Sequence, residues 1–117
     1  PLNEVLNNIG AAQSRRNLPA ALDSFQKAMD GDPADPDYQF NVGIALFKQG
    51  KLDLAADRFR AVLERSPEEP VSIRMLGRCL KGTLPRQQER AEPLERLKTN
   101  YSESAYWQLK NLLEPKK

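Results

Sequence analysis

The sequence predicts an all-α solenoid of about three antiparallel helix pairs plus a C-terminal capping helix, about seven helices in all. Five residues recur in register 34 positions later along the chain. Within each repeat the apolar residues follow helical spacing, and glycine or proline ends the helical segments. A fixed period of about 20 to 50 residues is typical of solenoids, whose units bury their apolar faces against their neighbours. The recurring pairs are Leu18 and Leu52, Ala21 and Ala55, Asp23 and Asp57, Phe25 and Phe59, and Pro33 and Pro67.

Length and composition indicate one domain over residues 1–117. The chain is 39% hydrophobic, which is enough for a core, yet it contains no run of about 18 apolar residues that could span a membrane. Residues 1–70 carry 8 Lys/Arg and 11 Asp/Glu, whereas residues 71–117 carry 10 and 5. The C-terminal half is therefore basic and could attract acidic peptides, anionic lipid or nucleic acid. A solvated helix surface rich in Arg and Lys is the simpler interpretation.

The compartment is left open by the sequence, although a reducing one such as the cytoplasm is favoured. Cys79 is the single cysteine, so no internal disulfide can form. No signal-peptide pattern opens the chain, and it begins with Pro1 in place of methionine. We therefore expect it to be a piece of a longer protein.

The first repeat, residues 1–34, is predicted to form a helical hairpin. Its apolar residues lie at helical spacing from about residue 3 to residue 30. The turn is one residue shorter than in the second repeat, and Asn17 is expected to take the left-handed conformation there. Pro19 suits the first turn of the next helix, where its missing N–H is no loss.

The second repeat, residues 35–68, follows the same plan with a clearer turn. A helix is predicted from Asp37 to Gln49, and Gly50 supplies the left-handed residue that commonly stops a helix. A second helix is predicted from about Leu52 to Arg65, before Pro67.

The third repeat, residues 69–101, is degenerate. It starts in register at Gly77, but its second helix, expected over residues 86–99, contains Pro93. Proline removes a backbone hydrogen bond and should bend that helix. A capping helix is expected over residues 102–114, because a solenoid needs a polar end.

These features resemble the tetratricopeptide repeat family. The resemblance is closest over the second repeat, from Asn41 through Gly50 to Ala55, Phe59 and Pro67. It implies a right-handed superhelix whose first helices line a concave groove, with protein or peptide binding as the usual role. The family's groove positions correspond here to Glu4, Asn7, Asn8, Ala11 and Arg15, then Phe40, Asn41, Ile44, Phe47 and Lys48, then Val71, Arg74, Met75, Arg78 and Lys81.

The groove so assigned is apolar at its centre and basic along one wall. It suits a peptide with hydrophobic anchors and acidic flanks. Phe40, Ile44 and Phe47 either pack between helices or face the ligand, and of the three together we expect some exposure. Asn41 either holds the backbone of a ligand or is an ordinary solvated residue.

One ligand class is disfavoured at these positions. Relatives that capture the C-terminal tail of cytosolic heat-shock chaperones use a clamp of lysine, asparagine and arginine, where this chain has Asn7, Ala11, Asn41, Val71 and Met75. Only Asn41 fits, and a terminal carboxylate needs cationic donors to offset its desolvation. We therefore expect no chaperone-tail binding of that type.

Catalytic chemistry is not indicated. The chain has no histidine, no cysteine cluster and no phosphate-binding glycine loop. The aspartates between residues 30 and 37 are interrupted by prolines and are better interpreted as turn and N-cap residues than as a calcium loop. Cys79 is expected to be a buried structural thiol. We expect no enzyme activity, no cofactor and no metal site.

Two other roles stay open. The first helix, with no unit before it, could stack on a further repeat or on another copy of the chain. Alternatively, Arg74, Arg78, Lys81, Arg86 and Arg90 could bind RNA. RNA binding is disfavoured, because helical-repeat RNA readers use polar side chains at fixed places in every unit, whereas the first two repeats here offer acidic or apolar ones.

Overall fold

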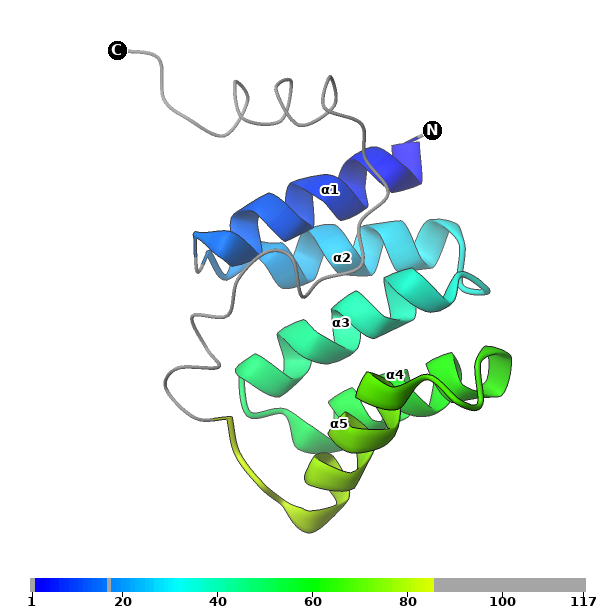
Figure 1. The fold of residues 1–117 in the computed structure, drawn as a ribbon. Helices are drawn as coiled ribbons and strands as arrows, with labels where there is room; N and C mark the ends of the chain where they lie inside the picture. The colour runs from blue at the N-terminus through cyan, green and yellow to red at the C-terminus, as the bar shows by residue number, and fades with distance from the viewer. Residues whose placement is uncertain (1, 17, 86–117) are drawn as a thin grey trace.

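The computed structural model describes residues 2–16 and 18–85, and within these ranges the chain is helical with no strand (Figure 1). The helices pack in sequence order, α1 on α2, α2 on α3, α3 on α4 and α4 on α5. Two antiparallel hairpins, α1 with α2 and α3 with α4, are therefore present, and α5 follows them. The helices are α1 (Leu2–Arg15), α2 (Ala20–Gly31), α3 (Pro36–Lys48), α4 (Leu52–Arg65) and α5 (Pro70–Lys81).

Several predictions concern residues outside the described ranges. They are the left-handed Asn17, the helix over residues 86–99 with its bend at Pro93, and the capping helix over residues 102–114. The described ranges hold five of the seven expected helices. None of these five has the length and apolar character needed to cross a membrane.

The starts of α3 and α5 are built alike, one repeat apart. Pro36 and Pro70 occupy the first turn, where a missing N–H costs nothing. Before them, the Asp35 carboxylate accepts a hydrogen bond from the Asp37 backbone N–H at 2.9 Å, and the Glu69 carboxylate accepts from the backbone of residues 71 and 72. These side chains satisfy donors that the first turn of a helix leaves unpaired. The N-cap interpretation of Asp35 is confirmed.

Two helices end just before a glycine that adopts the left-handed conformation needed in the turn. Gly50 has a φ of +77° and ends the second repeat's first helix, as predicted, and Gly82 has a φ of +74° just after α5. Residues with a Cβ rarely adopt this left-handed conformation. Pro19 lies one residue before α2, with a φ of −59° that already matches a helix.

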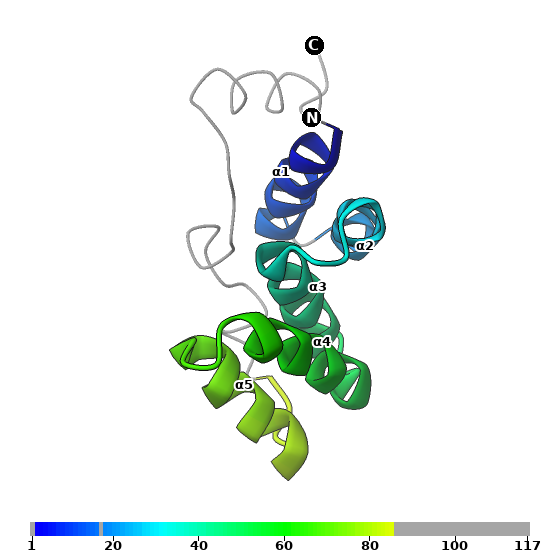
Figure 2. The same cartoon turned by 90° about the vertical axis from the view of Figure 1, so that its right-hand side faces the viewer.

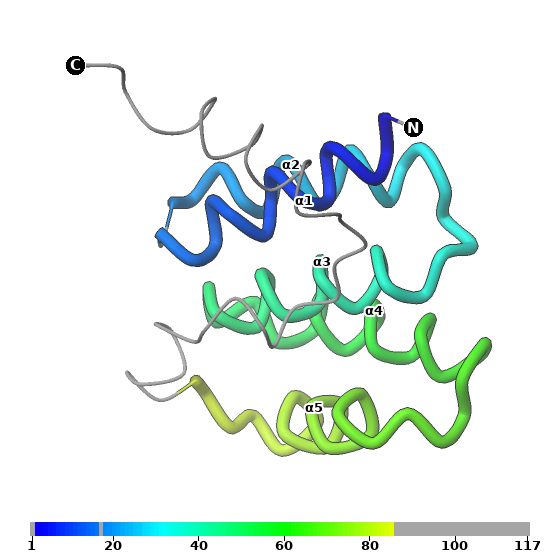
Figure 3. The backbone as a smooth tube through the Cα atoms, turned by 45° about the horizontal axis from the view of Figure 1, so that its top comes forward, coloured from blue at the N-terminus to red at the C-terminus, as the bar shows by residue number. Residues whose placement is uncertain are grey.

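The helices form two rows. In Figure 2, α1, α3 and α5 follow one another along the stack, while α2 lies beside them in a second row. Figure 3 shows α5 at one end of the stack and α1 with α2 at the other. We call α1, α3 and α5 the first helices, because each begins a repeat. Their side that carries the predicted groove positions is called the first-helix face.

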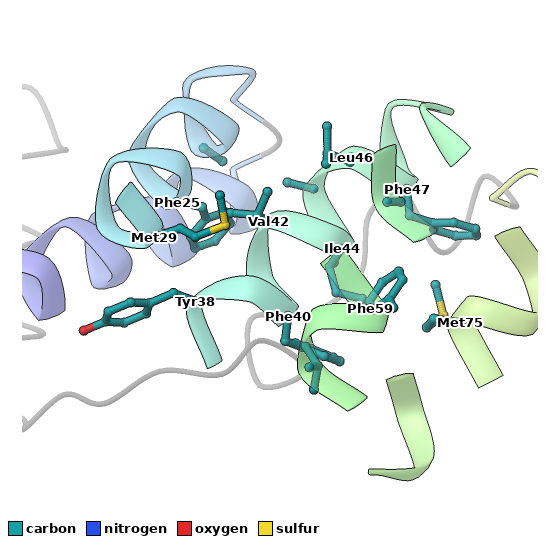
Figure 4. Close-up of a cluster of buried hydrophobic side chains, with 14 of the residues drawn as sticks. Phe25, Met29, Tyr38, Phe40, Val42, Ile44, Leu46, Phe47, Phe59 and Met75 are labelled. Carbon is teal, nitrogen blue, oxygen red and sulfur yellow. The ribbon is translucent and has the colours of Figure 1, made fainter. Parts of the chain in front are cut away.

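The core lies between the two rows and is centred on α3. Phe25 of α2 and Phe59 of α4 are fully buried, and in Figure 4 Val42 of α3 lies near Phe25 while Phe59 lies near Ile44. A helix that is apolar on all sides must be buried on all sides, and residues 38–47 of α3 are all buried.

Glycines on the first helices allow the hairpins to close tightly. A Cβ added to Gly10 would lie 2.6 Å from the Phe25 ring, and one added to Gly43 would lie 2.9 Å from the Phe59 ring. Real Cβ atoms essentially never approach a ring so closely. These two glycines therefore allow the second helix of each hairpin to approach the first closely.

Candidate functional site

The centre of the first-helix face is apolar, as predicted, but it is closed. Phe40, Ile44 and Phe47 of α3 expose only 2%, 6% and 2% of their surfaces. The expectation that these three side chains are partly exposed is therefore wrong. They contribute to the core. Truncating any of them should lower the free energy of unfolding, whatever its effect on ligand binding.

Specific ring contacts explain two of these burials. The Phe40 and Phe59 rings meet edge to face, with centroids 6.0 Å apart and planes at 70°. The Arg78 guanidinium carbon lies 4.7 Å from the centroid of the Phe47 ring, which is cation–π geometry. In Figure 4 the Phe47 side chain points toward Met75 of α5. Arg78, a predicted groove residue, thus contacts α3 through the Phe47 ring, and Met75, another, is part of the buried core.

Two buried asparagines join the first and second repeats. The Asn41 Nδ2 donates a hydrogen bond to the Asn7 Oδ1 at 2.8 Å, and the two residues are separated by 34 positions. Both are buried, so the bond lies in an environment where breaking it leaves polar groups that cannot recover water. Asn41 is therefore not a solvated residue. One more period along the chain, the same position holds Met75, which is buried and apolar.

Cations end all three first helices. Arg15, Lys48 and Lys81 lie in the last turns of α1, α3 and α5, where they also compensate the helix dipole. Together with Arg74 and Arg78 they form what we call the cationic rim. Arg15, Arg74 and Lys81 are exposed, and Lys48 and Arg78 are half-buried. Two ion pairs outside the rim join Lys27 to Asp23 and Arg60 to Asp57.

A hollow of about 410 Å³ adjoins the rim at the end of the first hairpin. It lies between the α1–α2 turn and the C-terminal end of α3, and its lining is mostly apolar with a lysine at its edge. Because α1 and α3 run in the same direction (Figure 1), the cations Arg15 and Lys48 fall at this same end. We call it the hairpin hollow. Its lining residues are Ser14, Leu18, Pro19, Ala21, Leu22, Ala45, Lys48 and Gln49.

The ionisable groups inside the fold have structural roles. Burial raises the pKa of the Cys79 thiol above its ordinary value of 9.0, although nearby Arg78 opposes the shift. Burial, aided by the Asp35 carboxylate, raises the pKa of Tyr38. Cys79 is thus a buried protonated thiol, as predicted. No group of three metal-ligating side chains gathers within the part of the chain that the structure describes.

The predicted site residues thus divide into three groups. Asn7, Ala11, Phe40, Asn41, Ile44, Phe47 and Met75 are buried. Lys48 and Arg78 are half-buried, and Arg15, Arg74 and Lys81 are exposed. Of the five residues considered for RNA binding, Arg86 and Arg90 lie outside the described ranges.

Comparison with known proteins agrees with this geometry. The profile of the tetratricopeptide repeat family matches residues 10–70, a little more than half of the chain. The chain belongs to the tetratricopeptide repeat family. The matched segment includes both glycine–phenylalanine contacts of the two hairpins. Repeats of this family generally mediate protein–protein interaction and are non-catalytic. No curated protein and no solved structure gives a significant match.

Sequence reasoning missed the asparagine pair and the hairpin hollow. The pair had a signal, because Asn7 and Asn41 are one period apart and both lie among apolar neighbours. The sequence signal for the hollow was weaker. It consisted of a small residue, Ala45, on α3 and of Leu18 and Pro19 in the α1–α2 turn, which together line the hollow. A period shows which residues are equivalent, but it does not show where two elements leave a space.

Proposed function

We propose that this tetratricopeptide repeat domain is a non-catalytic scaffold that binds a peptide across the first-helix face. The observation that carries the proposal is the cationic rim, with a cation at the end of every first helix. Helix dipoles explain one cation per helix, but Arg74 lies mid-helix and is exposed. Such a row of positive charge favours a partner with acidic residues.

The hairpin hollow supplies the apolar anchor site in this proposal. With Phe40, Ile44 and Phe47 closed, the hollow is an accessible apolar surface next to the rim. Its volume of about 410 Å³ is more than enough for one large aliphatic or aromatic side chain of a ligand. A ligand carboxylate beside that anchor would meet Lys48 and Arg15. The expected ligand is therefore a peptide with one large apolar side chain flanked by acidic residues.

Selection of random peptides displayed on phage against the full chain tests this ligand class. We expect enriched peptides to carry Asp or Glu within a few residues of a Leu, Phe or Trp. Binding of one such peptide, measured by fluorescence anisotropy, should weaken at least tenfold in the double variant Arg15→Glu, Lys48→Glu. It should also weaken with salt, because exposed charges are screened.

Arg65→Glu is the matched control. Arg65 also ends a helix and is exposed, so its reversal disturbs a helix dipole equally without touching the rim. We expect unchanged affinity. Enrichment of peptides without acidic residues, or equal losses in both variants, would contradict the proposal.

A second role is favoured by one observation. Leu2 and Val5 lie on α1, at the end of the stack opposite α5, and expose 71% and 44% of their surfaces. They lie one helical turn apart, so they form an apolar patch suited to stacking on another repeat. Light scattering after size exclusion tests self-association. A monomer at every concentration, unchanged by Leu2→Asp, would exclude stacking between copies.

A further inference from the structure

The joint between the first and second repeats is tied by polar side chains at one end, where the chain passes from α2 to α3. Gln39 of α3 donates a hydrogen bond from its Nε2 to the Pro33 carbonyl of this connection at 2.9 Å. Its Oε1 accepts a hydrogen bond from the Arg58 guanidinium of α4 at 2.8 Å, and the same nitrogen lies 3.5 Å from the Met29 sulfur of α2. One polar cluster thus connects α2, α3 and α4.

The asparagine bond is a second tie across the same joint. Asn41 follows Gln39 by two residues on α3, and its side chain bonds Asn7 of α1. All three residues are buried. Separating the repeats here would leave buried polar groups without partners, which costs more than the bonds themselves contribute. We call the side chains of Asn7, Gln39, Asn41 and Arg58 the polar pin.

The other end of the joint contains the hairpin hollow. In Figure 1 the α1–α2 turn and the α2–α3 connection lie at opposite ends of the first hairpin. The hollow is at the turn, with walls from both repeats, including Ser14 and Ala21 of the first and Ala45 of the second. Ala45 is one helical turn beyond Asn41, so the hollow begins where the polar pin ends. Atoms that border a space lack the dispersion contacts of a packed interface, so they resist movement less.

We propose that the joint between the first and second repeats is a hinge, which is pinned at the α2–α3 connection, opens and closes at the hairpin hollow, and is locked when an apolar side chain of the bound peptide fills the hollow. The locking step rests on the proposed function, whereas the hinge itself does not. Each unit of a solenoid contacts only its neighbours, so movement at this joint turns the first repeat against the rest. Arg15 and Lys48 lie on opposite sides of the joint, so locking it fixes their spacing for an acidic ligand.

Pairs of spin labels at equivalent positions of α2 and α4 compare the two ends of the joint. Ala20 with Leu54 reports on the end at the hollow, and Asp30 with Glu64 reports on the pinned end. The members of each pair are 34 residues apart, and all four residues are exposed. Each pair is changed to cysteine in the full chain carrying Cys79→Ser, and double electron–electron resonance measures the distances. The distribution at the hollow should be about twice as wide as at the pinned end.

Filling the hollow from within tests the lock without any ligand. Ala45→Leu should narrow the distribution at the hollow about twofold, to the width of the pinned end, because the larger side chain restores packing there. Ser14→Leu fills the hollow from the opposite wall and should act in the same way. Ala61→Leu is the matched control, since Ala61 lies on α4 away from the hollow lining, and should change neither distribution. Gln39→Ala should widen the distribution at the pinned end.

The peptide acetyl-EEWEE-amide, one tryptophan between acidic residues, tests locking by a ligand. At saturation it should narrow the distribution at the hollow as Ala45→Leu does, and that variant should bind it at least tenfold more weakly. Binding without narrowing would overturn the lock and leave the proposed function standing. Absence of binding would count against the proposed function, and the filled variants would still decide the hinge.

Two results would overturn the hinge itself. Equal widths at the two ends of the joint in the otherwise unchanged chain would show that the hollow gives no freedom of movement. A wide distribution at the hollow that neither Ala45→Leu nor Ser14→Leu narrows would show that the space does not control the movement.

Discussion

Helices α3 and α5 occupy equivalent places in successive repeats but have opposite surroundings. Residues 38–47 of α3 are all buried, whereas α5 buries Ser72, Met75 and Cys79 and exposes much of its remaining surface. Their side chains differ accordingly: Phe40 and Phe47 of α3 correspond to Arg74 and Lys81 of α5. Position within the period sets the direction of a side chain, and the neighbouring units decide whether it meets protein or water.

The comparison also separates stability from binding. In α3 a predicted groove residue such as Phe40 holds the hairpins together. In α5 the equivalent Arg74 is exposed and available to a partner. Solenoid stability is a sum over units and their interfaces, so changes around α3 should affect unfolding strongly and changes on the open side of α5 should not.

The largest difference is expected between Phe59→Ala and Leu80→Ala. Phe59 is fully buried and fills the space at Gly43, so its truncation should reduce the free energy of unfolding by about 4 kcal/mol. Leu80 is mostly exposed, and its truncation should change the free energy of unfolding by less than about 0.5 kcal/mol. Urea denaturation followed by circular dichroism measures both. Similar losses would refute the contrast between closed and open helices.

Alanine substitutions at Gly43 and Gly77 should change the free energy of unfolding in opposite directions. Gly43→Ala places a Cβ 2.9 Å from the Phe59 ring and 3.2 Å from the Arg58 Cβ, and such overpacking should cost about 2 kcal/mol. Gly77→Ala meets no described atom and should stabilise the protein by about 0.5 to 1 kcal/mol, the difference in helix propensity. Thermal unfolding compares the pair. A loss at both positions would mean that Gly77 is also covered.

The asparagine pair should show coupling of about 1 kcal/mol. Asn41→Ala leaves the buried Asn7 Oδ1 without its 2.8 Å donor and should cost about 1 to 3 kcal/mol. A double-mutant cycle with Asn7→Ala isolates the bond, because the second change then costs less. The matched change in α5, Met75→Ala, should show no coupling to Asn7. Strictly additive losses at the two asparagines would show that the bond contributes nothing to stability.

The smallest effect concerns Cys79. Burial raises its folded-state pKa above the unfolded value, so the stabilisation it contributes is complete below pH 9 and is lost as the pH rises through the folded-state pKa. At pH 8 the thiol should react with a disulfide reagent at least tenfold more slowly than an Ile73→Cys thiol on the open side, placed in a Cys79→Ser background. Equal rates would show that both sides of α5 are open.

The hairpins were predictable because their determinants are local and repeated. Apolar spacing, Gly50 and the prolines 36 and 70 specify where helices start and stop, and the structure agrees within a residue or two. Exposure was not predictable in the same way. The apolar run over residues 38–47 indicated that α3 is buried on all sides. We instead assigned several of these residues to an open groove, because they match the groove positions of the family.

The sequence by itself determined the repeat, the helical hairpins, the family and the distribution of charge, since these depend on residue identity and spacing along one chain. Only the tertiary structure decided that Phe40, Ile44 and Phe47 are core, that Asn7 and Asn41 bond to each other, and that no ring among the described residues covers Gly77 as rings cover Gly10 and Gly43. The physical reason is that burial and pairing depend on which atoms of other helices arrive at a face. A period makes positions equivalent, but the ends of the stack have different neighbours.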